Sequence, residues 1–249
     1  LNVEQAKTLP GLRLVLSLGG PYPFGQAAKS VFEYKNLSYQ AVAQMPGEPN
    51  DDHFAWTGNR NAPVAVYNDE IPRDGWCGIV TLAERLAPEP SIIPENSEDR
   101  VTMFGLCEEM CAENSLGWAR RLMLVDMMLA QGEDSPFAPV ATVLGQRYGL
   151  SPEALSEAPA RIVDVLNMLS TRLHSQKSIG SPYFVGDRVT AADIYWACIA
   201  MMFAPLPEDV NPIDPGSRAA YGYLTPELDA ALDPILLAHR DMMYRDHLK

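Results

Sequence analysis

The hydrophobic pattern of the chain changes at a proline-rich segment, PEPSIIPENS, at residues 88–97. Before this segment short apolar runs alternate with helical stretches, and after it nearly every stretch has helical periodicity. Three prolines within the segment cannot continue a helix. We therefore predict an α/β domain at residues 1–87, a linker at 88–97 and an all-helical domain at 98–249, a division that the chain length allows.

Within the first part, the pattern predicts a βαβ unit followed by a hairpin and a helix. The expected strands are LRLVLSL, YQAVAQ and PVAVYN, with a helix from Gln26 to Lys35 between the first two. A turn at NDE leads into a brief edge strand in EIPR, which we expect Pro72 to end. The segment GWCGIVTLAERLA then has the apolar spacing of a helix.

The second part contains two long amphipathic runs, at 97–131 and 151–176, and one strongly apolar segment. Thr190 and Asp193 form a variant of the capping box, with Val189 and Ile194 at the positions of a hydrophobic staple. The residues that follow are apolar on nearly every helical face. We predict a central, buried helix here.

Composition excludes several classes of function. A net charge of −13 argues against nucleic acid or an anionic membrane as the partner, and no apolar run approaches the ~20 residues of a membrane helix. No signal peptide is evident, so a cytoplasmic protein is the default expectation. The four cysteines form no CxxC pair and have no matching His spacing, so we expect no metal site, and we expect Cys107 and Cys111 to be reduced core or near-core residues. A Ser-His-Asp hydrolase is disfavoured because no G-x-S-x-G occurs.

Four segments, in order, resemble the glutathione transferase superfamily. GDRVTAADIYWA is similar to the cap of the central helix in the family's C-terminal domain, and PFGQAAKSVFEYKNLSY is similar to its first helix and second strand. NAPVAV resembles the loop with the family's cis-proline, and DGWCGIVTLAERL resembles its third helix. The resemblance implies a thioredoxin-like N-terminal domain, an all-α helical-bundle C-terminal domain, a homodimer, and glutathione as co-substrate without a metal.

The resemblance also implies positions for glutathione. Pro63 is the expected cis-proline, Ala62 offers its backbone to the cysteinyl part, and Phe24 lies at the helix entry. Asp74 and Gly75 stand where the family has Glu or Gln followed by Ser. Asp74 can still accept from the γ-glutamyl amine, and the Gly75 N–H suits a carboxylate. The missing serine hydroxyl is expected to weaken binding roughly ten- to a hundredfold unless Arg73 or another group compensates.

Tyr22 occupies the place where related enzymes keep a catalytic serine or cysteine, so tyrosine is a departure. Stabilising a thiolate by two pKa units requires about 2.7 kcal/mol, which a helix N-terminus and a hydroxyl can supply together. Ser17 and the backbone N–H groups near Gly25 are the other candidates, and Tyr22 can instead only pack over the mouth of the site. Glutaredoxin-like redox chemistry is disfavoured because no cysteine lies here.

The electrophile pocket is expected on the first long helix of the second domain, at Trp118, Arg121, Leu122 and Val125. Arg121 suggests an anionic group on a small hydrophobic electrophile, although core packing explains the apolar pair equally well. The tail after residue 203 is expected to cover the pocket or the domain interface, and to end in a helix that starts at Thr225. His239 is expected on a helix surface, and His53 in a polar loop.

Two functions stay open. One is a glutathione-dependent enzyme that performs conjugation, thiolytic cleavage or isomerisation. The other is a non-catalytic protein of the same fold that binds a ligand or a partner.

Overall fold

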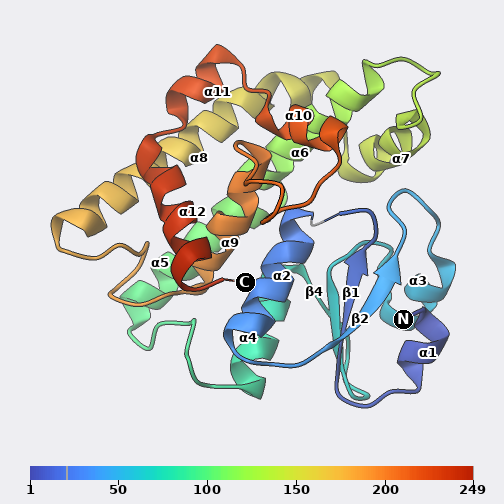
Figure 1. Ribbon diagram of the computed structural model, residues 1–249, viewed down its shortest axis with the longest axis horizontal. Helices are drawn as coiled ribbons and strands as arrows, with labels where there is room; N and C mark the ends of the chain where they lie inside the picture. Colours follow the sequence, from blue (N-terminus) through green and yellow to red (C-terminus); the bar gives the residue numbers. More distant parts are fainter. Residues whose placement is uncertain (21, 249) are drawn as a thin grey trace.

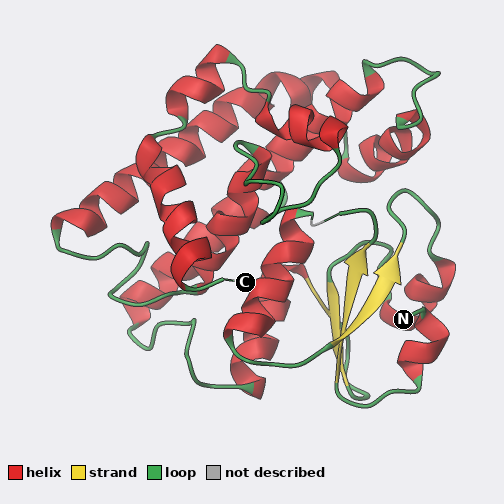
Figure 2. Ribbon diagram, viewed as in Figure 1, coloured by secondary structure: helices red, strands yellow, loops and turns green. Residues whose placement is uncertain are grey.

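The N-terminal part of the computed structural model, which describes residues 1–20 and 22–248, is a four-stranded sheet with helices on both faces (Figures 1 and 2). The strand order is β2-β1-β3-β4. β1 pairs in parallel with β2 and antiparallel with β3, and β3 pairs antiparallel with β4. The strand bounds are β1 Leu12–Ser17, β2 Gln40–Gln44, β3 Val64–Tyr67 and β4 Arg73–Asp74. This is the predicted thioredoxin-like arrangement.

Alternating side chains assign the two faces of the sheet. Leu14 and Ala65 point into the main core, whereas Val15 and Val64 belong to a separate small core on the other face. The small core is covered by α1 and α3, and the main core by α2 and α4 (Figure 1). These helices are α1 Val3–Lys7, α2 Pro23–Tyr34, α3 Asp51–Thr57 and α4 Gly75–Leu86.

The prediction for the edge strand was wrong in position. Pro72 precedes β4 instead of ending it, and the ladder pairs Val64 with Asp74 and Ala65 with Arg73. Proline has no N–H to donate to a sheet, so pairing starts only after it. Ile71, which the prediction placed in the strand, is 78% exposed.

The C-terminal part is entirely helical in its described residues, as predicted. The run at 97–131 is two helices and not one, because Asn114 has a left-handed φ of 61° and the hydroxyl of Ser115 accepts from the N–H of Trp118 as a new N-cap. The helices are α5 Ser97–Cys111, α6 Leu116–Leu129, α7 Ala138–Tyr148, α8 Pro152–Ser178, α9 Ala191–Ile199, α10 Pro215–Gly222, α11 Pro226–Ala231 and α12 Pro234–Asp246, with a 3-10 turn at Ala200–Met202.

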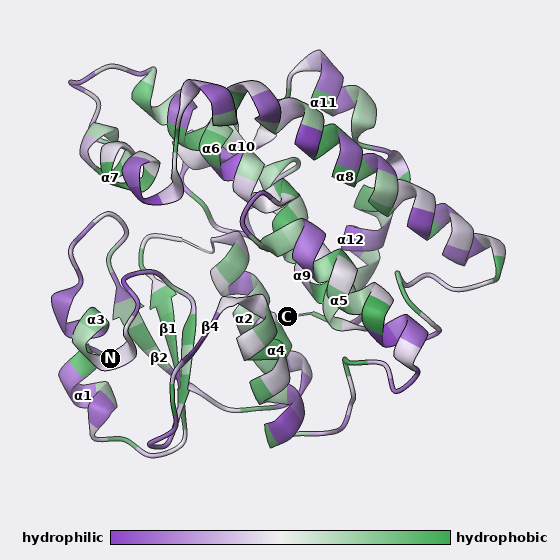
Figure 3. Ribbon diagram, turned by 180° about the vertical axis from the view of Figure 1, so that it is seen from behind, coloured by the Kyte–Doolittle hydropathy of each residue, from purple (hydrophilic) through white to green (hydrophobic). Residues whose placement is uncertain are grey.

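Helix α9 is the predicted buried helix, and every residue in it is buried. Figure 3 shows hydrophobic residues gathered on the strands and on α9. The carboxylate of Asp193 accepts from the backbone N–H and the hydroxyl of Thr190, which confirms the capping box. α2 packs against α9, so the two parts of the chain share one core.

Three smaller expectations were wrong. His239 is 4% exposed because α12 packs on α9, and His53 is 2% exposed in α3 instead of lying in a polar loop. The helix that starts after Thr225 is the short α11, and α12 follows it. Cys107 is buried and Cys111 is partly buried, as expected for core or near-core residues.

Two kinds of feature are absent from the described residues. None of the helices in 1–20 and 22–248 combines the length and the apolar character needed to cross a bilayer. The same residues hold no group of three or more His, Cys, Asp or Glu side chains arranged to bind a metal ion.

Candidate active site

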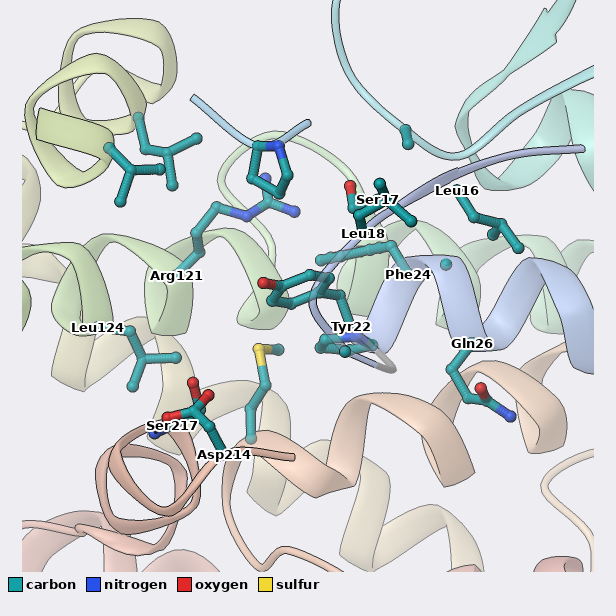
Figure 4. A pocket seen from close by; sticks show the side chains of 18 of the residues that line it. Leu16, Ser17, Leu18, Tyr22, Phe24, Gln26, Arg121, Leu124, Asp214 and Ser217 are labelled. Atoms are coloured by element: carbon teal, nitrogen blue, oxygen red, sulfur yellow. Dashed lines mark hydrogen bonds between the residues drawn. The ribbon is translucent and has the colours of Figure 1, made fainter. Parts of the chain in front are cut away.

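Two cavities lie between the sheet domain and the helical domain. The larger has a volume of about 700 Å³, and its walls come from the loop after β1, the start of α2, and helices α6, α7 and α10 (Figure 4). The smaller has a volume of about 310 Å³ and lies between the segment 59–63, the start of α4, and helices α6 and α7. The two cavities share part of their walls.

The smaller cavity contains the backbone features that the sequence placed together. The Ala62–Pro63 peptide bond is cis, as predicted, and Asp74 and Gly75 lie beside it at the start of α4. Oδ2 of Asp74 accepts from Nδ2 of Asn59 at 2.8 Å. Gly75 has a φ of +64°, a conformation that favours glycine, and this places the first N–H groups of α4 at the cavity. These groups suit a ligand that carries an amine and a carboxylate.

Helix α7 closes the smaller cavity from the other domain. Nη1 of Arg147 donates to Oδ1 of Asn61 at 2.7 Å, across the boundary between the domains. The ring of Tyr148 meets that of Trp118 edge-on, with centroids 5.2 Å apart. The hydrogen bond and the aromatic pair both help to hold this wall in place.

Tyr22 is the residue before α2 and has an extended backbone, so its side chain stands at the mouth of the helix. It lines the larger cavity, and Figure 4 shows its ring inside the space between Arg121 and Asp214. Burial, followed by the nearby charge of Asp214, raises the pKa of the Tyr22 phenol. The hydroxyl is therefore protonated at neutral pH and available as a hydrogen-bond donor.

Ser17 also lines the larger cavity, but its hydroxyl is already engaged. Its Oγ donates to Oε1 of Gln44 at 2.7 Å. The amide of Gln44 in turn donates to the carbonyls of Met45 and Arg60. A role for Ser17 in activating a thiol would require this chain of hydrogen bonds to open.

Comparison of the sequence with curated proteins found no match. Residues 152–225 match the family described as "Glutathione S-transferase, C-terminal domain". Among solved structures, a glutathione S-transferase from Methylobacillus flagellatus, with glutathione bound, aligns with a TM-score of 0.64 and 13% identity over 94% of this chain and 95% of that one. The chain has the glutathione transferase fold.

Two other structures share it. A glutathione S-transferase from Methylobacterium radiotolerans, in complex with glutathione sulfonate, aligns with a TM-score of 0.56 and 17% identity over 92% of this chain and 93% of that one. A beta-etherase from a Sphingobium strain aligns with a TM-score of 0.56 and 16% identity over 93% and 99% of the two chains. At these identities the likeness describes the fold and not the reaction.

Within the glutathione transferase fold, the predicted site residues divide between the two cavities. Pro63, Asp74, Gly75 and Trp118 line the smaller one, while Tyr22, Ser17 and Val125 line the larger; Phe24, Ala62 and Arg121 line both. Leu122 lines neither cavity and is buried. Leu122 follows Arg121 on α6, so the side chain of Leu122 points about 100° around the helix axis from that of Arg121.

Sequence reasoning missed the residues that α7 and α10 contribute. Tyr148 lines both cavities, and Asp214 and Tyr221 line the larger one. Hydrogen bonds from Ser217 lower the pKa of Asp214, while burial raises that of Tyr221. The tail was expected to reach the pocket or the interface, but which of its residues do so depends on how α10 packs, and no local motif signals this.

Proposed function

We propose that the protein binds glutathione in the smaller cavity and presents its thiolate to an apolar electrophile in the larger one. The observation that carries this proposal is the junction of the two cavities, because the smaller holds Asp74 and the start of α4 and the larger offers apolar side chains such as Leu124 and Val125. Glutathione or glutathione sulfonate is bound in the structures from Methylobacillus flagellatus and Methylobacterium radiotolerans, which share the fold.

In this proposal each part of glutathione has a partner. The cysteinyl backbone pairs with Ala62 beside Pro63, the γ-glutamyl amine with Asp74, and its carboxylate with the N–H groups at the start of α4. Phe24 packs against the ligand from α2. The electrophile lies between the loop 16–18 and helices α6, α7 and α10, where apolar side chains such as Leu124 and Val125 form the walls.

The reaction requires a thiolate. The glutathione proton passes to water, and the sulfur keeps the electron pair that forms a bond to the electrophilic carbon while the leaving group departs with its own pair. The thiol has an intrinsic pKa of about 8.5, so the protein must favour the anion to react at neutral pH. Tyr22, whose hydroxyl is protonated, is our candidate donor to this sulfur.

A second candidate function is ligand binding without catalysis. It is favoured by one observation: of the described residues, neither hydroxyl proposed to activate the thiol, on Tyr22 or Ser17, lines the smaller cavity, and that of Ser17 is bonded to Gln44. A homodimer and a cytoplasmic location are further parts of the main proposal. Light scattering coupled to size-exclusion chromatography tests the dimer.

The test of function is calorimetric titration with glutathione, with thiolate absorbance followed in parallel, for the native chain and Tyr22→Phe. Tyr223→Phe is the matched control, because Tyr223 is 57% exposed and lines neither cavity. We expect micromolar to low-millimolar binding, and turnover of 1-chloro-2,4-dinitrobenzene with release of chloride. Binding without thiolate formation favours the non-catalytic function, and no binding at ~10 mM, equivalent to less than about 3 kcal/mol, contradicts both uses of glutathione.

A further inference from the structure

Arg121 lies where the two cavities meet. Four of the described residues line both cavities, namely Phe24, Ala62, Arg121 and Tyr148, and Arg121 is the charged one among them. Lys29 lines only the larger cavity and Arg147 only the smaller, where it donates to Asn61. The junction therefore carries a positive charge on one side chain, which Figure 4 shows above the ring of Tyr22.

Three aromatic rings from three helices hold this guanidinium. Its Cζ lies 4.6 Å from the ring centroid of Phe24 in α2, 5.4 Å from that of Trp118 in α6 and 4.3 Å from that of Tyr148 in α7. Contact with ring faces stabilises the cation and fixes its position without using its N–H groups. The donors at the edge of the guanidinium are left for another partner.

None of the residues 1–20 and 22–248 accepts a hydrogen bond from these donors. Arg121 makes none of the hydrogen bonds or ion pairs of this part of the chain, whereas its neighbour Arg120 donates to the carbonyls of Met202, Ala220, Tyr221 and Tyr223. The two arginines therefore differ in their hydrogen bonding. Arg120 is fully buried and tied to the backbone of the tail, and Arg121 faces the cavities with its donors unused.

Two carboxylates line the cavities, Asp74 in the smaller and Asp214 in the larger, but neither forms an ion pair with Arg121 among the described residues. The groups that act on the charge of Arg121 are the phenols of Tyr148 in α7 and Tyr221 in α10 and the thiol of Cys111 in α5, with no carboxylate among the described residues. Burial raises the pKa of Tyr221 and of Cys111, so neither becomes an anion at neutral pH. A partly desolvated cation without a counter-ion favours the binding of an anion beside it.

The identity of that anion follows if the proposed function holds, and the inference rests on it. The new carbon–sulfur bond must form between a ligand in the smaller cavity and one in the larger, so the sulfur of glutathione has to lie at the junction. The geometry points to Arg121 as a catalytic residue that donates to the glutathione thiolate and stabilises its charge. The proton leaves to water, and the sulfur keeps the electron pair.

The test measures the pKa of the bound thiol from thiolate absorbance against pH, and the dissociation constant of glutathione by calorimetry. The variants are Arg121→Met, which keeps the length of the side chain, and Arg121→Lys, which keeps the charge. Arg100→Met is the matched control, because the guanidinium of Arg100 also lies over an aromatic ring, 5.4 Å from the centroid of Phe104, but lines neither cavity.

We expect Arg121→Met to raise the pKa of the bound thiol by about one unit or more, the shift that matches the loss of one charged hydrogen bond. Arg121→Lys should raise it less, and Arg100→Met should leave it unchanged. Should Arg121→Met fail to fold, Arg121→Lys tests the inference, because loss of the planar guanidinium should still weaken the contact with the sulfur and raise the thiol pKa.

Two results overturn the inference and differ from failure of the proposed function. An unchanged thiol pKa in a folded Arg121→Met that binds glutathione normally removes Arg121 from the sulfur. If Arg121→Met binds glutathione more weakly but leaves the thiol pKa unchanged, Arg121 contacts a carboxylate of glutathione instead of the sulfur. If the native chain itself binds no glutathione, the proposed function fails and this inference fails with it.

Discussion

Nε2 of His239 lies 2.8 Å from Oδ1 of Asp193, and this contact joins the last helix, α12, to the start of the buried helix α9. The same oxygen accepts from the N–H of Phe184, and the other oxygen accepts from the N–H and the hydroxyl of Thr190. Both side chains are almost completely buried. One carboxylate thus satisfies donors from three segments of the chain.

Asp193→Asn should therefore be strongly destabilising, by about 3 to 5 kcal/mol, because one oxygen becomes an amide that faces the two donors of Thr190. His239→Gln should lower the free energy of unfolding by less, about 1 to 2 kcal/mol, since the other three hydrogen bonds to Asp193 remain. Urea unfolding of both variants measures the difference. A loss below 1 kcal/mol for Asp193→Asn would show that the interior adapts to the amide.

The contrast between these two residues explains how much of the fold the sequence predicts. The capping box is encoded within four residues, so Thr190 and Asp193 could be read from their spacing, as could the strands with their alternating pattern. His239 was misplaced because its burial depends on α12 packing against α9, a contact between segments distant in the chain. Hydrogen bonds between residues close in the sequence can be predicted from their spacing. Which face of an amphipathic helix is buried depends instead on the helices that pack against it.

The same distinction applies to the candidate site. The cis peptide bond before Pro63 and the place of Asp74 and Gly75 at a helix start were predicted from a motif and lie together. The division of the space into two cavities was not predicted, because it depends on where α7 and α10 place Tyr148 and Tyr221. Tyr22 could be assigned to the helix entry, but not to one cavity or the other.

Gly47 should be more sensitive to substitution than Gly58, although both have left-handed backbones, with φ of +79° and +73°. An added Cβ at Gly47 would lie 2.6 Å from Cγ2 of Val140 in α7, whereas at Gly58 it would meet nothing within 4 Å. Gly58→Ala should lower the free energy of unfolding by about 1 to 2 kcal/mol because of backbone strain alone. Gly47→Ala should lower it distinctly more, because the contact with Val140 adds to that strain.

Urea unfolding measures both glycine variants, and Val140→Ala in the Gly47→Ala background provides the control. The double variant should recover part of the loss, because the smaller side chain relieves the contact with α7 but not the backbone strain. Equal losses for Gly47→Ala and Gly58→Ala would mean that α7 moves freely away from the loop.

Asp233 should make the stability of α12 depend on pH in the acid range. Its carboxylate accepts from the N–H of Ile235, from Ser170 and from His174, and these hydrogen bonds lower its pKa to about 2. The folded pKa is below the unfolded one, near 3.9, so this stabilisation is present above about pH 4 and is lost as the pH falls through about 2.

At pH 7 Asp233→Ala should lower the free energy of unfolding by about 1 kcal/mol, the usual effect of losing an N-cap. The difference from the native chain should shrink between about pH 4 and 2, as measured by urea unfolding at each pH. Thr225→Ala, which removes the hydroxyl cap of α11, is the control whose cost should not follow pH. A pH-independent cost for Asp233→Ala would mean that its carboxylate contributes no titrating interaction.

Asp74→Asn tests the proposed anchor for the γ-glutamyl amine. The amide keeps an oxygen that can accept from Asn59, so the loop should stay in place while the negative charge at the smaller cavity is lost. We expect the dissociation constant for glutathione to rise roughly ten- to a hundredfold, as for one charged hydrogen bond, with little change in the pKa of the bound thiol. Asp52→Asn on the exposed face of α3 removes the same charge away from the cavities and should leave binding unchanged. Equal dissociation constants for the two variants would remove Asp74 from the binding site, and a raised thiol pKa in Asp74→Asn alone would mean that the amine anchor also positions the sulfur at the junction.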